Sequence, residues 1–138
     1  MEFTRRETLA IGAGAALMTI LPLRVSAAAE DKINEFTGGA AIADGGVELT
    51  APEIAENGNT VPVSVSAAGA SAILLLATGN PTPGVATFNF GPLAASQAAS
   101  TRIRLAGTQD VVAIAKLADG SFARASKTVK VTIGGCGG

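Results

Sequence analysis

Short segments in which apolar and polar residues alternate recur about every ten residues between Val47 and Ile133, and they limit the possible folds more than any other feature. Residues 60–66 alternate valine with polar residues or proline, and Ile103 and Leu105 alternate with two arginines. Because successive side chains of a β-strand point to opposite faces, this alternation is typical of strands with one buried face. Strands at this spacing predict an all-β chain folded as an antiparallel β-sandwich.

Three of these segments carry signals about their place in the sheets. Pro62 cannot donate a hydrogen bond to a neighbouring strand, so its strand is expected at a sheet edge or with a bulge. Residues 72–77 are apolar on both faces, so this strand should lie deep or have its outer face covered, with another subunit as one candidate cover. In the last strand, Val129, Val131 and Ile133 are expected to face the core.

Turn signals separate the predicted strands. Asp119-Gly120 lies between residues 111–117 and 122–133 and predicts a β-hairpin, since glycine supplies the positive φ that such turns need. Pro52 and Asn57-Gly58 indicate a loop over residues 51–58. Residues 30–36 are interpreted as a short polar lead, and no helical pattern of useful length is expected after residue 29.

The composition excludes several classes of function. The chain of 138 residues has a formal net charge of −1 and is 48% hydrophobic, which excludes a basic nucleic-acid binder and a disordered acidic tail. It contains no His, Trp or Tyr, so imidazole bases, histidine metal sites and broad aromatic platforms are excluded. The single cysteine, Cys136, becomes the main candidate for covalent chemistry.

The first 29 residues resemble a twin-arginine export signal. Arg5 and Arg6 precede a mostly apolar run over residues 9–23, and the small residues Ser26-Ala27-Ala28-Ala29 offer cleavage after Ala27 or Ala29. The run is only moderately hydrophobic and barely long enough to span a bilayer, so a stable membrane anchor is not expected. The twin-arginine route generally carries folded cargo, which allows a partner without its own signal to be carried across.

Cys136 lies among four glycines, Gly134, Gly135, Gly137 and Gly138, directly after the last predicted strand. Glycine neither fixes the backbone nor buries a thiol, so residues 134–138 are predicted to form a flexible arm with an exposed thiol. Five extended residues reach roughly 17 Å, enough to enter a cleft in another protein. Without a second cysteine for an internal disulfide, this thiol is expected to bond to another molecule or to carry covalent chemistry.

Activation of the thiol is expected to come from the enzyme that receives the arm. An ordinary cysteine has a pKa near 8.5, so only a small fraction is ionised at neutral pH, and the chain has no histidine to act as a base. The flanking glycines suit a narrow channel that excludes side chains. The alternative is a disordered linker with an incidental cysteine, which is less favoured because the arm is symmetric about Cys136.

Several segments together resemble the SoxY family, the sulfur carriers of the bacterial thiosulfate-oxidising Sox system. They are residues 49–58, Val61-Pro62-Val63, Asn80-Pro81, residues 101–104 and, most specifically, residues 129–138. The twin-arginine signal agrees with the family as well. Phe122 stands where many relatives would have a tyrosine, a departure that does not touch the arm.

The resemblance implies an immunoglobulin-like sandwich that pairs with a partner lacking its own signal, SoxZ, in the periplasm. It also implies that a haem enzyme, SoxAX, joins thiosulfate to Cys136 as an S-thiosulfonate, and that a manganese-dependent hydrolase, SoxB, releases sulfate and leaves a persulfide. Where it is present, SoxCD would oxidise the outer sulfur. On this view the chain is a carrier rather than an enzyme and holds no metal, haem or other tightly bound cofactor itself.

Two charged pairs are left without a functional role. Glu53 and Glu56 are three residues apart but have no evident base or metal partner, and exposed carboxylates of this kind are ordinary. Arg102 and Arg104 could attract thiosulfate, yet alternating charges on a strand are commonly a solvated face. Neither pair is assigned to the active site.

Two rival functions remain open. A ubiquitin-like carrier would store sulfur as a thiocarboxylate on Gly138 after adenylation, but the compartment outside the inner membrane lacks ATP. A non-catalytic exported β-sandwich subunit would use Cys136 for an intermolecular disulfide. Blocking the thiol with iodoacetamide should spare the first rival, and the second predicts a reducible dimer without sulfur adducts.

Overall fold

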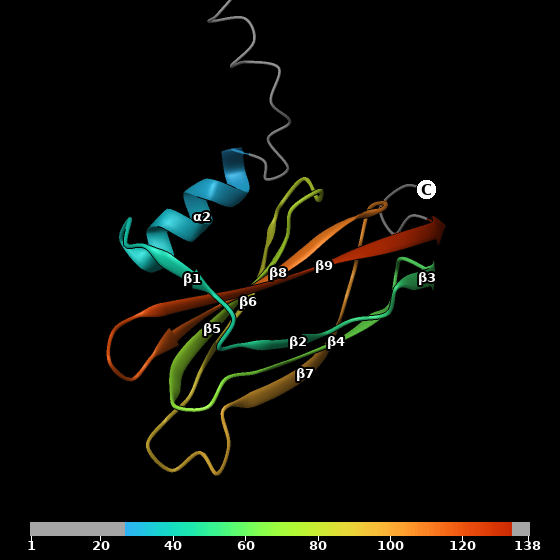
Figure 1. The fold of residues 1–138 in the computed structure, drawn as a ribbon. Helices are drawn as coiled ribbons and strands as arrows, with labels where there is room; N and C mark the ends of the chain where they lie inside the picture. Colours follow the sequence, from blue (N-terminus) through green and yellow to red (C-terminus); the bar gives the residue numbers. More distant parts are fainter. Residues whose placement is uncertain (1–26, 134–138) are drawn as a thin grey trace, which may run out of the picture.

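The computed structural model describes residues 27–133, which form a β-sandwich with one helix against its outer face (Figure 1). The order of strands is β1-β9-β8-β5-β6 in the larger sheet, where β3 also pairs with β9, and β2-β4-β7 in the smaller sheet. The predicted all-β sandwich is therefore confirmed. The elements are α2 (Ala27–Thr37), β1 (Ile42–Asp44), β2 (Glu48–Thr50), β3 (Ile54–Asn57), β4 (Val61–Ser66), β5 (Ala70–Ala77), β6 (Gly84–Asn89), β7 (Ala98–Ile103), β8 (Gln109–Leu117) and β9 (Phe122–Ile133).

The main core lies between the two sheets and is built from the alternating residues of the strands. Val61, Val63 and Val65 of β4 are buried, while Pro62 between them is exposed. Ile73 and Leu75 of β5 meet them from the opposite sheet within the same cluster. Beyond the end of β7, Leu105 is fully buried and Arg104 is exposed, so the predicted alternation of residues 102–105 is confirmed. Within residues 27–133, no helix has the length and hydrophobicity needed to cross a membrane.

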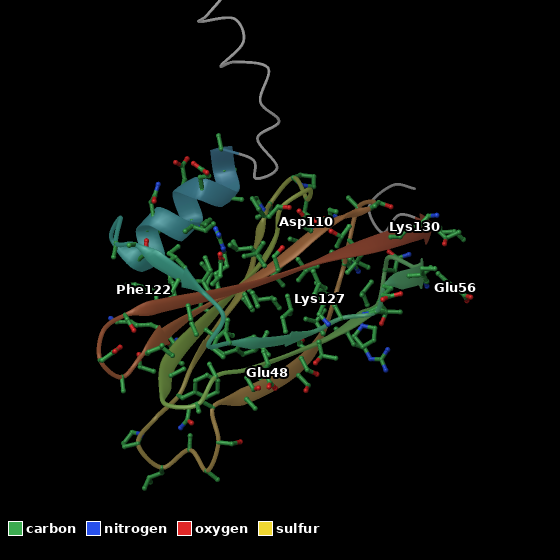
Figure 2. The ribbon with its side chains drawn as sticks, in the orientation of Figure 1. Glu48, Glu56, Asp110, Phe122, Lys127 and Lys130 are labelled. Atoms are coloured by element: carbon green, nitrogen blue, oxygen red, sulfur yellow. The ribbon has the colours of Figure 1, made fainter. Side chains whose placement is uncertain are left out.

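Helix α2 covers the outer face of the larger sheet, so the expectation that no helix follows residue 29 is wrong. Ile33 and Phe36, one turn apart, pack on a second apolar cluster formed by Leu74, Leu76, Val112, Ile114 and Phe122. Figure 2 shows Phe122 beneath the helix, and its ring meets that of Phe36 edge-on at 5.8 Å between centroids. Gly38, directly after the helix, has a φ of 67° and donates its N–H to the carbonyl of Asn34, which ends the helix.

This helix explains the strand that is apolar on both faces. Ile73 and Leu75 face the core between the sheets, whereas Leu74 and Leu76 face α2. The sequence pattern correctly predicts that the outer face is covered, but the cover is the chain's own helix. The apolar run therefore gives no argument for a second subunit at this place.

Strand β4 is the middle strand of the smaller sheet, so the edge position expected from Pro62 holds only locally. Strand β2 pairs with β4 from Ser64 to Ser66, whereas Pro62 is paired with Arg102 of β7 alone. Among the described residues, no strand adjoins the other side of β4 at Pro62. The missing N–H of the proline therefore costs no interstrand hydrogen bond there.

The predicted hairpin between β8 and β9 is confirmed. Gly120 has a φ of 85°, and β9 has the bounds that the sequence indicates. The side-chain hydroxyl and the N–H of Ser121 both donate to Oδ1 of Asp119, and these hydrogen bonds lower the pKa of Asp119 from its ordinary value. The long strand β9 then carries the chain from this hairpin across the whole sandwich (Figure 1).

Candidate functional site

The predicted functional residues lie outside the part of the chain that the structure describes. These are Cys136, the surrounding Gly134, Gly135, Gly137 and Gly138, and the export residues Arg5 and Arg6. The structure does describe β9, the strand that leads directly to Gly134. We call residues 54–58 and 130–133 the C-terminal anchor, because residues 54–58 bind the last four residues before Gly134.

Strand β3 forms one side of the C-terminal anchor, and it replaces the loop expected over residues 51–58. It runs parallel to the end of β9, with Ile54 opposite Lys130 and Asn57 opposite Ile133. Just before β3, the carbonyl of Glu53 accepts a hydrogen bond of 2.9 Å from the N–H of Lys130. The end of β9 is therefore paired as a strand in the anchor.

Gly58 closes the C-terminal anchor by a close backbone approach. Its N–H donates to the carbonyl of Ile133 at 2.8 Å, and its carbonyl accepts from the N–H of Leu105 at 2.8 Å. A Cβ atom at this position would lie 2.5 Å from the carbonyl oxygen of Leu105 and 2.9 Å from that of Ile133. Since both neighbours are backbone, only glycine fits here without a shift of the chain.

The segment between β7 and β8 holds β9 from the other side. The N–H of Val131 donates to Oγ1 of Thr108 at 3.0 Å, beyond the point where β8 and β9 cease to pair at Gln109 and Val129. Next to this last pair, the hydroxyl of Thr128, the residue before Val129, donates to Oδ1 of Asp110 at 2.6 Å. Both flanks of the strand are thus fixed almost to its end.

Asn80, part of one of the segments that carry the resemblance, supports this flank. Its side-chain amide donates to the carbonyl of Arg104 at 2.8 Å, and its Oδ1 accepts from the N–H of Ala106 at 2.9 Å. The same Oδ1 accepts from Nε2 of Gln109, whose side chain is almost fully buried. These hydrogen bonds tie the turn after β5 to the segment that presents Thr108 to β9.

The side chains of the C-terminal anchor divide into a packed and an exposed set. Ala55 is buried and Val131 packs against the main core, whereas Ile133 is 59% exposed, so its expected place in the core is wrong. Ile133 lies two residues after Val131, the last residue of β9 that packs on the core. Glu56 and Lys130 are exposed, and Figure 2 shows both at this end of the molecule.

The two charged pairs that have no assigned role, the glutamates and the arginines, lie in different segments of the chain. Glu53 directly precedes the C-terminal anchor and Glu56 lies within it, both with exposed side chains, and Glu53 contributes to the anchor through its backbone carbonyl. Arg102 lies on β7 of the smaller sheet and donates to Oγ1 of Thr60 at 3.3 Å. Within residues 27–133, no group of three or more His, Cys, Asp or Glu is placed to hold a metal ion.

Sequence reasoning identified the thiol but missed the residues that fix the strand before it. The sequence predicts turn residues at Asn57 and Gly58, which stand in a segment that carries the family resemblance. No local signal distinguishes Gly58 from an ordinary turn glycine, because its close neighbours, Leu105 and Ile133, are distant in the sequence. Thr108 carries no local pattern that distinguishes it from other loop residues.

The geometry limits where the thiol can be. Cys136 follows Ile133 by three residues, which at full extension separates their Cα atoms by at most about 11 Å. Ile133 itself is fixed through its carbonyl to Gly58. The C-terminal anchor thus gives a tethered thiol a fixed point of attachment at one end of the sandwich.

Comparisons with known proteins match the chain to one family of sulfur oxidation proteins. The sequence profile of the family described as sulfur oxidation protein SoxY matches residues 33–136, more than half of the chain. The sulfur carrier protein SoxY from Chlorobium limicola f thiosulfatophilum is 36% identical, with 75% of this chain and 96% of that chain covered and a TM-score of 0.66. The comparison with curated protein sequences gives no match.

More distant structures share the fold alone. The superoxide reductase (neelaredoxin) from Ignicoccus hospitalis is 20% identical, with 63% of this chain and 80% of that chain covered and a TM-score of 0.55. A putative superoxide reductase from Thermotoga maritima is 14% identical, with 70% of this chain and 89% of that chain covered and a TM-score of 0.51. The profile match, the identity to the Chlorobium protein and the strand that leads into Gly-Gly-Cys-Gly-Gly together show that this chain belongs to the SoxY family of sulfur carrier proteins.

Proposed function

We propose that this protein is a periplasmic carrier that holds the sulfur intermediates of thiosulfate oxidation covalently on Cys136 and presents them to the Sox enzymes. The observation that carries the proposal is the C-terminal anchor. It fixes the backbone of β9 as far as Ile133, and the Gly-Gly-Cys-Gly-Gly sequence begins at the next residue. A fixed strand followed at once by glycines around a thiol suits a short tether on a rigid body.

The first step of the proposed cycle is an oxidative conjugation. The thiol of Cys136 and the outer sulfur of thiosulfate form an S–S bond, giving cysteine S-thiosulfonate, one proton and two electrons. The haem enzyme SoxAX accepts the two electrons. The thiolate is the form of cysteine that makes such bonds, and this chain has no histidine to generate it, so deprotonation falls to the enzyme.

The later steps release sulfate and restore the carrier. Water, supplied through SoxB, cleaves the bond between the outer sulfane sulfur and the sulfonate, and sulfate, a proton and a cysteine persulfide result. In a cell that has SoxCD, three waters and the loss of six electrons and seven protons convert the persulfide to a cysteine S-sulfonate. A second hydrolysis, in which water cleaves the bond between the cysteine sulfur and the sulfonate, then gives sulfate, a proton and the free thiol of Cys136.

Tethering gives the chain its part in this chemistry. A bound intermediate cannot diffuse away, and attachment raises its effective concentration at each enzyme that binds the carrier. The chain supplies neither the oxidant nor the base, and the metals and haem belong to the partner enzymes. We therefore infer that it is a covalent substrate of those enzymes and is not itself an enzyme.

Thiol blocking separates this proposal from its rivals. The purified carrier is incubated with thiosulfate, SoxAX and an electron acceptor, with or without prior treatment by iodoacetamide, and its intact mass is recorded. We expect an adduct that dithiothreitol removes in the untreated protein and none in the alkylated protein. An adduct that survives alkylation would favour a thiocarboxylate on Gly138, and a disulfide dimer alone would favour an assembly subunit.

The Gly135→Val substitution tests whether the arm enters a narrow channel. A branched side chain next to Cys136 is expected to lower the rate of SoxAX-dependent loading by about tenfold or more, because a channel that fits glycine excludes it. Gly91→Val is the matched control, since Gly91 lies in open space with an ordinary φ. Loading of Gly135→Val at the parent rate, with equal alkylation by iodoacetamide, would contradict the narrow channel.

Export together with SoxZ is the proposed reason for the twin-arginine signal at Arg5 and Arg6. The signal-less partner would bind the folded carrier in the cytoplasm and cross with it. Coexpression of SoxZ with the full chain should place SoxZ in the periplasm, whereas coexpression with a carrier lacking residues 1–29 should leave it in the cytoplasm. A SoxZ that reaches the periplasm equally in both cases would overturn this part of the proposal.

A further inference from the structure

Helix α2 overlaps the two cleavage positions that the sequence leaves open at the end of the export signal. The helix spans Ala27–Thr37, so a cut after Ala27 falls at its first described residue and a cut after Ala29 falls two residues further along. Both positions offer a signal peptidase the small residues that it recognises, Val25-Ser26-Ala27 in one case and Ala27-Ala28-Ala29 in the other. The sequence therefore does not decide between the two cuts.

The three alanines at the start of α2 differ in burial. Ala27 and Ala28 are exposed, whereas the surface of Ala29 is 0% exposed. Ile33 follows Ala29 by four residues and Phe36 follows Ile33 by three, so the three residues share one face of the helix. Ile33 and Phe36 pack on the second apolar cluster, and Figure 1 shows α2 lying against the larger sheet. Ala29 thus belongs to the packed face of the helix.

Burial of Ala29 separates the two cuts. A signal peptidase binds the residues before the scissile bond as an extended chain, and the residue directly before the bond is small because its side chain enters the active site. Ala27 reaches this position when a single residue is released from the described end of α2. Ala29 reaches it only if the first turn of the helix unwinds and a buried side chain is withdrawn from its packing.

The proposed route of export makes this difference decisive. The twin-arginine route generally carries folded cargo, so the peptidase meets α2 after it has docked on the larger sheet. Cleavage of a folded segment depends on the fraction of molecules in which that segment is open. The end of a helix opens at little cost in free energy, whereas a packed turn opens rarely.

We infer that the signal is removed after Ala27, so that the mature carrier begins at Ala28 and keeps Ala29 in the packed face of α2. Water cleaves the peptide bond between Ala27 and Ala28, which leaves a carboxylate on Ala27 and an ammonium group on Ala28. This inference rests on the proposed export and assigns the processing site within it. Residues 28 and 29 then belong to the folded domain rather than to the signal.

The charges near the start of α2 suit an amino terminus at Ala28. A positive charge at the N-terminal end of a helix is opposed by the helix dipole. Glu30 and Asp31 follow Ala28 by two and three residues, and their exposed carboxylates offset the new ammonium group. A cut after Ala29 would instead place the ammonium group on Glu30 itself and remove the most buried residue of the helix.

The amino terminus of the exported protein tests the inference directly. The full chain is expressed in a bacterium that has the twin-arginine route, and the periplasmic protein is examined by intact mass and by sequencing of its first peptide. We expect chains that begin at Ala28. Products that begin at Ala29 or Glu30 are lighter by one or two alanine residues, and either one as the main product would overturn the inference.

Phe36→Ala tests whether the docked helix selects the site. Loss of the ring that packs edge-on against Phe122 loosens α2, so chains that begin at Glu30 should increase at least about tenfold relative to the parent. Phe90→Ala is the matched control, because Phe90 is also half-buried but packs against the main core, and it should be processed like the parent. Phe36→Leu replaces the alanine variant in this comparison if alanine prevents export.

The outcomes separate the processing site from the proposed function. A loosened helix that leaves Ala28 as the sole amino terminus would show that the packing of α2 does not select the cut, and the inference would fail. A chain that stays in the cytoplasm with its signal attached would overturn both the export and this inference. An exported chain that is cut elsewhere overturns the processing site alone, because sulfur adducts on Cys136 still report the carrier function.

Discussion

Cys136→Ser is expected to abolish sulfur loading completely. Serine keeps the size and polarity of the side chain, but its oxygen cannot form the reversible S–S bond on which every step of the proposed cycle depends. The expected loss is larger than for any other substitution, because Cys136 is the only cysteine in the chain. The measurement is the intact mass of the variant after incubation with thiosulfate, SoxAX and an electron acceptor.

The control for this variant is its fold. The described residues 27–133 do not include position 136, and the substitution should leave the melting temperature within about 1 °C of the parent because serine and cysteine are close in size. A variant that is folded and still acquires a sulfur adduct would contradict the assignment of the attachment site. In that case another group of the chain would have to carry the sulfur.

Gly58→Ala is expected to have the largest effect on stability. The added Cβ would lie 2.5 Å from the carbonyl oxygen of Leu105 and 2.9 Å from Cγ1 of Val131, so the backbone has to move. Crowding of this kind, with weakening of the hydrogen bonds to Ile133 and Leu105, should lower the free energy of unfolding by about 2–4 kcal/mol. For a domain of this size the melting temperature should fall by about 10–20 °C.

Amide hydrogen exchange locates the effect. In Gly58→Ala the N–H groups of residue 58 and Leu105 should lose protection first, since they donate the two hydrogen bonds that the glycine makes possible. Gly91→Ala is the matched control, because a Cβ at Gly91 meets no atom within 4 Å and its φ is ordinary. A melting temperature for Gly58→Ala within about 2 °C of the Gly91→Ala value would show that the close approach at Gly58 is not a constraint.

The parts of the fold that the sequence predicts correctly depend on local patterns. Strand β9 has its predicted bounds because the Asp119-Gly120 turn and the alternation before Ile133 are both encoded within a few residues. The valines of β4 are inward for the same reason. In each case the signal lies within one strand or in the turn that joins two neighbours.

The parts that it does not predict depend on distant contacts. In β3 only Ala55 is buried, so four residues carry too little alternation to distinguish a strand from a loop. What makes β3 a strand is its pairing with β9, whose residues lie more than seventy positions away in the chain. Helix α2 buries Ala29 and packs Ile33 and Phe36 on the second apolar cluster, and so short a helical period is easily missed in a segment where polar residues predominate.

The candidate site divides in the same way. The chemistry of Cys136 follows from the residue types around it, because a single thiol among glycines has few other uses. The C-terminal anchor does not follow from them, since Gly58 and Thr108 become partners of β9 only when the sandwich forms. The exposure of Ile133 is a further case, because alternation alone places it in the core, and only the folded chain shows that it is exposed.

The central claim is that Cys136 carries sulfur during thiosulfate oxidation, and intact mass spectrometry tests it most directly. The protein is isolated without reductant from cells that are oxidising thiosulfate, and its mass is recorded before and after treatment with dithiothreitol. The account predicts added sulfur atoms or a thiosulfonate, located on the peptide that contains Cys136 and removed by the reductant. A bare thiol, or a simple disulfide dimer, during active thiosulfate oxidation would contradict it.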